Sequence, residues 1–158
     1  MKDLWEVGEF VCRIRARMRF GELSRAPIRL LRLELRGDAA QCDWLARPLD
    51  VWAGTLPRHI RDRDASLQAL QDAVALREML FVSLTDVQSA DFRIFRQEAR
   101  EPPLLIINGT VTREMPSVPR VTSPVMKAKL CGFHFQMDDG VLEPLEMEDG
   151  GVQFKVSA

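Results

Sequence analysis

Tyrosine is absent from this chain of 158 residues, histidine occurs twice and cysteine occurs three times. Histidine and cysteine supply many of the bases, nucleophiles and zinc ligands of proteins. Because Cys12, Cys42 and Cys131 are odd in number and far apart, they indicate neither a disulfide framework nor a zinc site. We expect three reduced thiols in apolar surroundings, which is typical of a cytoplasmic protein.

Long apolar runs are also missing from the sequence. No segment approaches the roughly 20 apolar residues that a membrane span requires. The first nine residues include acids where a secretory signal needs an apolar core. We therefore expect no membrane association, and the composition, 46% hydrophobic and 28% charged, predicts one ordinary domain over residues 1–158.

Charge is nearly balanced overall but unevenly distributed. The formal net charge of −1 argues against a protein dedicated to nucleic acid. Residues 1–36 carry nine basic against five acidic residues, whereas residues 101–158 carry five against eight. The two ends could neutralise each other within the fold or between two copies, or they could leave a basic surface for an anionic partner.

The segment over residues 10–20, FVCRIRARMRF, alternates apolar and basic residues. A period of two predicts a half-buried β-strand, with the apolar side chains facing the core. The opposite side of this strand would carry a row of four arginines, Arg13, Arg15, Arg17 and Arg19. The alternative is that these guanidinium groups are only solvated, or are paired with acids such as Glu22 and Glu34.

Two further strands and a loop are predicted before the middle of the chain. Residues 28–36 alternate with a phase slip at Leu30–Leu31, which a β-bulge would correct. Residues 40–47 place Cys42 and Trp44 on one face of a strand. Residues 48–64 are rich in helix breakers and charges, and we expect them to form a crossing loop.

A helix is predicted over residues 65–81, with Asp62 or Asp64 as its N-cap. Its apolar residues cover about half of the circumference, as in a helix held against a curved sheet, and Gln68 and Asp72 fall on the opposite side. Arg77 falls within the apolar face. Its guanidinium must therefore be paired with an acid or extend to the helix rim, or it must line a polar pocket between helix and sheet.

The C-terminal half is predicted to be all strand, over residues 91–96, 104–113, 125–137, 141–147 and 152–156. Asn108-Gly109 indicates either a hairpin or a bulge within one long strand, and we favour the long strand. Gly132 is interpreted as a bulge that leaves His134 on the outer face. The sequence thus predicts an α+β fold, in the order βββ-α-βββββ. Seven or eight mostly antiparallel strands would form a partly closed barrel or roll with one long helix packed on it.

No known family is recognised, and no catalytic, metal-binding or phosphate-binding motif stands out. Our first hypothesis is a non-catalytic binding module for an anionic small molecule or an acidic protein, with a homodimer through a sheet edge as an option. Its candidate ligand-binding residues are Arg13, Arg15, Arg17, Arg19, Arg77 and His134, and no metal or cofactor is expected. The alternative is a small enzyme in which Arg77 orients a carboxylate and His134 or His59 is the base.

Overall fold

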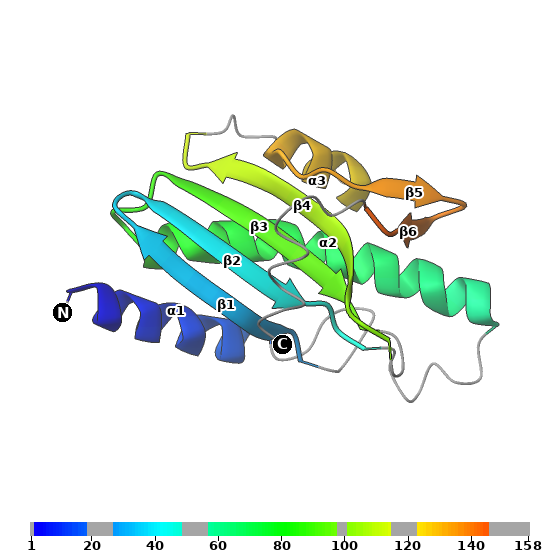
Figure 1. Ribbon diagram of the computed structural model, residues 1–158, viewed down its shortest axis with the longest axis horizontal. Coiled ribbons are helices and arrows are strands. Elements are labelled where there is room, and N and C mark those ends of the chain that lie inside the picture. Colours follow the sequence, from blue (N-terminus) through cyan, green and yellow to red (C-terminus); the bar gives the residue numbers. More distant parts are fainter. Residues whose placement is uncertain (1, 19–26, 49–56, 98–100, 115–122, 146–158) are drawn as a thin grey trace.

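In the computed structural model, the described residues form three helices and two separate sheets (Figure 1). The structure describes residues 2–18, 27–48, 57–97, 101–114 and 123–145. Their elements in chain order are α1 (Lys2–Arg17), β1 (Arg29–Arg36), β2 (Ala39–Leu45), α2 (Arg58–Ser83), β3 (Ser89–Arg96), β4 (Leu104–Thr112), α3 (Pro124–Cys131), β5 (Gln136–Asp138) and β6 (Val141–Glu143). The fold is α+β, but the predicted barrel or roll of seven or eight strands with one helix is wrong. The described strands form an open mixed sheet, β1-β2-β3-β4, and a small β5-β6 sheet.

The largest correction is α1, which replaces the predicted N-terminal strand. Phe10, Ile14 and Met18 are buried at intervals of four residues. Positions four apart share one face in a strand and lie close together on a helix, so these three residues fit both patterns. Cys12 and Ala16 distinguish the strand from the helix. A strand would bury them beside Phe10 and Ile14, but both are exposed.

The change from strand to helix also disperses the predicted arginine row. Residues two apart on a helix point about 200° away from each other. Arg13, Arg15 and Arg17 therefore do not share one face of α1, and Arg19 lies outside the described residues.

The predictions for β1 and β2 are confirmed. The two strands pair antiparallel, and their register shifts between Leu30 and Arg32, where the bulge was predicted. Leu31 is the exposed residue at the shift, while Cys42 and Trp44 of β2 are fully buried. The bulge thus keeps the leucines that follow it on the core side.

The predicted central helix is confirmed as α2, but it begins seven residues earlier. Its N-cap is Pro57, without a side-chain hydrogen bond, so the prediction of Asp62 or Asp64 as the N-cap is wrong. The charged stretch that we expected to be loop is helical from Arg58. Arginine is a good helix former, and Arg58 and Asp62 form an i,i+4 pair at 3.8 Å.

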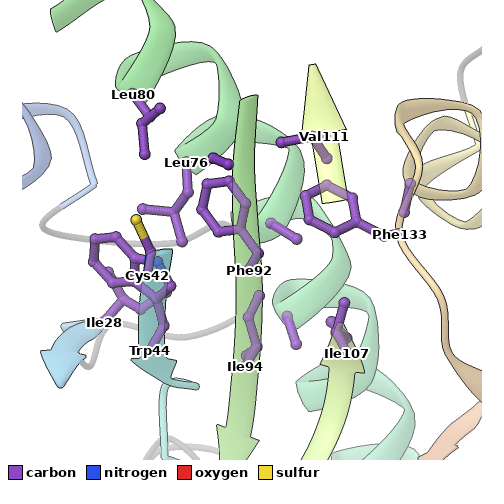
Figure 2. Packing of buried hydrophobic residues seen from close by; sticks show 14 of the residues in the cluster. Ile28, Cys42, Trp44, Leu76, Leu80, Phe92, Ile94, Ile107, Val111 and Phe133 are labelled. Atoms are coloured by element: carbon purple, nitrogen blue, oxygen red, sulfur yellow. The ribbon is translucent and has the colours of Figure 1, made fainter. Parts of the chain in front are cut away.

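The main sheet is mixed because β2 and β3 pair in parallel. A parallel pair needs a long crossover, and α2 lies within the segment that connects these two strands. α2 covers one face of the sheet, and Trp44, Phe92 and Ile94 point from the strands towards it (Figure 2). The Phe10 ring meets the Trp44 ring edge-on at 6.0 Å, so α1 packs on the same core.

β4 runs through Asn108-Gly109, which confirms the long-strand interpretation. The bulge expected at Gly109 is wrong, because the register shifts at Ile106, between the pairs Ile94–Ile107 and Phe95–Leu105. A Cβ at position 109 would collide with the backbone carbonyl of Gly132, and Gly109 has a positive φ of 155°. The glycine therefore permits a close approach between β4 and the end of α3.

The predicted strand over residues 125–137 is wrong, because its first part is α3. Ser123 is the N-cap and accepts a hydrogen bond from the Met126 amide, and proline occupies the first helical position. Gly132, with φ of 105°, ends the helix in a left-handed conformation instead of forming a bulge. The turn at residues 138–140 is confirmed as the β5–β6 connection, and the predicted strand over 152–156 lies outside the described residues.

Truncation of Ile14 tests the packing of α1. Ile14→Ala should lower the free energy of unfolding by about 2–5 kcal/mol, because it leaves a cavity in the core. Val82→Ala is the control, because Val82 is 60% exposed on α2, and its effect should stay within about 0.5 kcal/mol. Urea denaturation followed by circular dichroism measures both variants. Equal effects would contradict the burial of this face of α1.

Candidate functional site

The face of the main sheet that points away from the helices carries most of its charge. Strand register places two polar rows across β1 to β4. One row is Arg32, Asp43, Arg93 and Asn108, and the other is Glu34, Gln41, Asp91 and Thr110. We call these residues, together with Arg36, the charged sheet face. They alternate along the strands with core residues, so they form the opposite surface of the sheet.

The centre of the charged sheet face is a bidentate ion pair between β2 and β3. Arg93 donates from Nε to Asp43 Oδ1 at 2.8 Å and from Nη2 to Oδ2 at 2.6 Å. Asp43 is fully buried, and the Arg93 side chain is 17% exposed. Hydrogen bonding to Asp43 raises the pKa of Arg93. Because each group satisfies the other, this pair fixes the two strands and leaves little capacity for a ligand.

A second charged group lies at the β1 end of the face and is more open. Glu34 lies between Arg32 and Arg36 and accepts hydrogen bonds from both, with 2.8 Å from Arg36 Nε to Glu34 Oε1. The side chains of Arg32 and Arg36 are 50% and 82% exposed. Hydrogen bonds from Arg36 and then from Arg32 hold the pKa of Glu34 below 4.5. A guanidinium has five N–H donors, so each arginine keeps donors that no described residue accepts from.

The arginines predicted from the N-terminal segment lie near the end of α1. Arg15 and Arg17 are exposed in its last turn, and Arg13 is half-buried one turn earlier. Cations at this position complement the partial negative charge of a helix C-terminus. Two arginines of the predicted site are therefore also explained by helix stability.

Arg77 is held by a backbone carbonyl and an aromatic ring rather than by an acid. Its Nη2 donates to the Thr112 carbonyl at 2.8 Å, which ties α2 to the end of β4. Its guanidinium lies 5.4 Å from the centre of the Phe81 ring. Arg113 lies over the same ring at 5.1 Å and donates to the carbonyls of Phe81, Leu84 and Val87. These contacts assign Arg77 a part in holding the C-terminal end of α2 against the sheet.

The two histidines lie on different elements and are both exposed. The main chain of His134 pairs with Asn108 of β4 through hydrogen bonds of 2.6 and 3.0 Å, while His59 lies in the first turn of α2. Within the part of the chain that the structure describes, no contact joins Arg77 to either histidine. Burial raises the pKa of the Cys42 and Cys131 thiols, which disfavours the nucleophilic thiolate. The enzyme hypothesis therefore stays a prediction without a geometric argument in its favour.

Sequence reasoning missed a buried ion pair. Arg47 donates from Nε to Asp72 Oδ2 at 2.7 Å and from Nη2 to the Met18 carbonyl at 2.8 Å. Gln68 donates to Asp72 Oδ1 at 3.0 Å. Burial raises the pKa of Asp72, and the bonds from Arg47 and Gln68 oppose this shift. The helical pattern predicts Gln68 and Asp72 on the outer side of the helix, which is wrong, because both are buried. They are buried because Asp72 pairs with Arg47, which lies 25 residues away in sequence.

Metal binding and membrane crossing find no support in the described residues. None of their His, Cys, Asp and Glu side chains gather in a group of three that could hold a metal ion. In the same part of the chain, no helix combines the length and hydropathy needed to cross a lipid bilayer.

Comparison of the chain with models of known protein families, with curated proteins and with solved structures finds no match.

The pKa of Glu34 tests the contacts of this carboxylate with Arg32 and Arg36. Arg36→Gln should raise this pKa towards 4.5, and by more than Arg32→Gln, because Arg36 contributes the larger shift. A pH titration followed by carbon NMR of the Glu34 carboxyl measures both effects. Arg58→Gln is the control, because Arg58 pairs with Asp62 on α2. An unchanged pKa in the Arg36 variant would contradict the geometry.

The buried pair can be tested with single and double variants. Asp72→Ala should lower the free energy of unfolding by about 3–5 kcal/mol, because it leaves the Arg47 charge buried without its partner. The apolar double variant Arg47→Met/Asp72→Leu should recover most of this loss. Chemical denaturation near pH 7 measures both. A double variant as unstable as Asp72→Ala would show that the unpaired charge is not the cause.

Proposed function

We propose that this protein is a non-catalytic binding module that recognises an acidic segment of another protein. Its binding surface consists of the exposed arginines Arg32 and Arg36 of β1. The observation that carries the proposal is the group at β1, where two exposed guanidiniums converge on one carboxylate, Glu34. The remaining donors of Arg32 and Arg36 can take further carboxylates in the same way.

The spacing of this group suits an extended acidic peptide. Arg32 and Arg36 lie on the same face of β1 at alternate positions with Glu34, and such positions repeat about every 6.6–7 Å. An extended peptide presents its own alternate side chains at the same interval. Acidic residues at every fourth position of the partner would thus align with Arg32 and Arg36, and the partner residue between them, opposite Glu34, should be neutral or basic.

The shape and charge of the surface distinguish this partner from two others. Small-molecule sites are usually concave, whereas these arginines stand along one strand of an open sheet. Binding to a phosphate backbone relies on many basic contacts, and the charged sheet face intersperses Glu34, Asp43 and Asp91 among its arginines. An acidic protein segment is therefore favoured over an anionic metabolite and over nucleic acid.

A labelled octaglutamate peptide tests the proposal through fluorescence anisotropy. The protein should bind this peptide at 50 mM salt and more weakly at 200 mM, because salt screens exposed charges. Arg32→Gln/Arg36→Gln should weaken binding about fivefold, since each exposed ion pair contributes roughly 0.2–1 kcal/mol.

The matched control removes two exposed cations elsewhere, in the variant Arg58→Gln/Lys127→Gln. Residue 58 lies in the first turn of α2, and residue 127 lies on α3 beyond the β4 edge (Figure 1). This variant should keep the affinity within twofold. Absence of binding at 50 mM salt, or an equal loss in the control variant, would overturn the proposal.

A further inference from the structure

The outer side of α1 exposes apolar surface that the described fold does not use. Trp5 is 73% exposed, the largest exposed fraction of any large apolar side chain in the described residues. Gly8, Cys12 and Ala16 are exposed on the same side of the helix, opposite Phe10 and Ile14. Tryptophan is enriched at the centres of protein interfaces. This side therefore has the composition of a contact surface.

We propose that a second copy of this chain covers the outer side of α1. In the proposed dimer the two α1 helices pack antiparallel, with a twofold axis that passes close to Val11. This inference concerns self-association and does not depend on the proposed binding of an acidic partner.

Charge complementarity argues for a second copy and for the antiparallel arrangement. Glu9 and Arg13 lie on the same flank of the exposed apolar side, two residues before and two residues after the axis. A twofold axis near Val11 places Glu9 opposite Arg13 of the partner subunit, and this pair occurs twice. Neither residue forms an ion pair with another described residue, so both are available. A parallel arrangement would instead bring Arg13 close to Arg15 of the partner subunit.

Side-chain size is complementary in the same register. Trp5 of one copy lies over the end of the partner helix that carries the small Ala16, and Trp5 of the partner subunit does the same at the other end. Gly8 has no atom within 4 Å of the position that a Cβ would occupy, so the space in front of it is open. The small side chains near the axis allow two helices to approach closely, while the indoles fill the ends of the interface.

Cys12 provides a direct measure of this geometry. It lies one residue from the proposed axis and is exposed as a free thiol. Two such thiols in an antiparallel pair would face each other within one helical turn, close to the separation of about 4.4–6.8 Å between Cα atoms that a disulfide needs. Exchange with oxidised glutathione, which is reduced to two glutathione thiols, should therefore join the two Cys12 thiols in one intersubunit disulfide, and Cys12→Ser should prevent this.

A charge swap gives the decisive test, by sedimentation equilibrium of the full chain under reducing conditions. The protein should associate reversibly into dimers. Glu9→Arg and Arg13→Glu should each lower the association constant at least tenfold, because each puts like charges opposite one another. The double variant Glu9→Arg/Arg13→Glu should restore association to within threefold, because opposite charges then face each other again.

Apolar truncations supply the matched comparison, and circular dichroism checks that each variant is folded. Trp5→Ala should lower the association constant at least tenfold, whereas Val82→Ala, at an exposed position on α2, should leave it within twofold. A protein that stays monomeric up to 0.2 mM would overturn the inference. So would a dimer that resists both single charge reversals, a swap that fails to restore association, or an oxidised dimer that survives Cys12→Ser.

Discussion

The buried contact between Arg47 and Asp72 joins three elements that no other described hydrogen bond connects. Arg47 follows β2, Asp72 lies in the middle of α2, and the Met18 carbonyl at the end of α1 accepts from the same guanidinium. Carbonyls at a helix end have no partner within the helix, so Arg47 also satisfies one of these groups. A buried charge tolerates little displacement from its partner, and the position of α1 against the sheet is therefore tied to α2 and β2.

This constraint determines which surfaces are open for function. With α1 and α2 on one core, apolar side chains of the main sheet face the helices and its charges occupy the opposite face. The Asp43–Arg93 pair neutralises the middle of that face, so the exposed guanidiniums are concentrated on β1 at the edge. Docking of Phe10 and Ile14 on the core leaves Trp5 on the outside of α1. Both proposed contact surfaces, the arginines of β1 and the Trp5 side of α1, are therefore the sides that α1 and the sheet turn away from their shared core.

The sequence predicts those parts of the fold that local patterns determine alone. Alternation and a phase slip predicted β1 with its bulge at Leu31, and they placed Arg32, Glu34 and Arg36 on the polar side of that strand. The pattern could not assign α1, because Phe10, Ile14 and Met18 fit both periods and only the exposure of intervening residues separates them.

Elsewhere a local helix signal competes with an alternating pattern, or the structure depends on contacts that are not local in sequence. Ser123, followed by proline and later by Gly132, is a helix start and stop, yet alternation over residues 125–137 favoured a strand. The parallel pairing of β2 with β3 and the Arg47–Asp72 contact depend on residues that meet only in the folded chain. Local patterns therefore predicted the polar face of β1, but they did not predict that the preceding segment, α1, is a helix.

The physics of edge strands also decides where self-association should occur. A sheet edge that carries charged side chains and a bulge resists pairing with another edge, and β1 has both features. The homodimer through a sheet edge that the sequence leaves open is therefore disfavoured at β1. The β4 edge is already occupied, because Asn108 pairs with His134 and the Leu105 carbonyl accepts from the Leu145 amide. With these two edges protected in different ways, the exposed indole side of α1 is the better surface for a second copy.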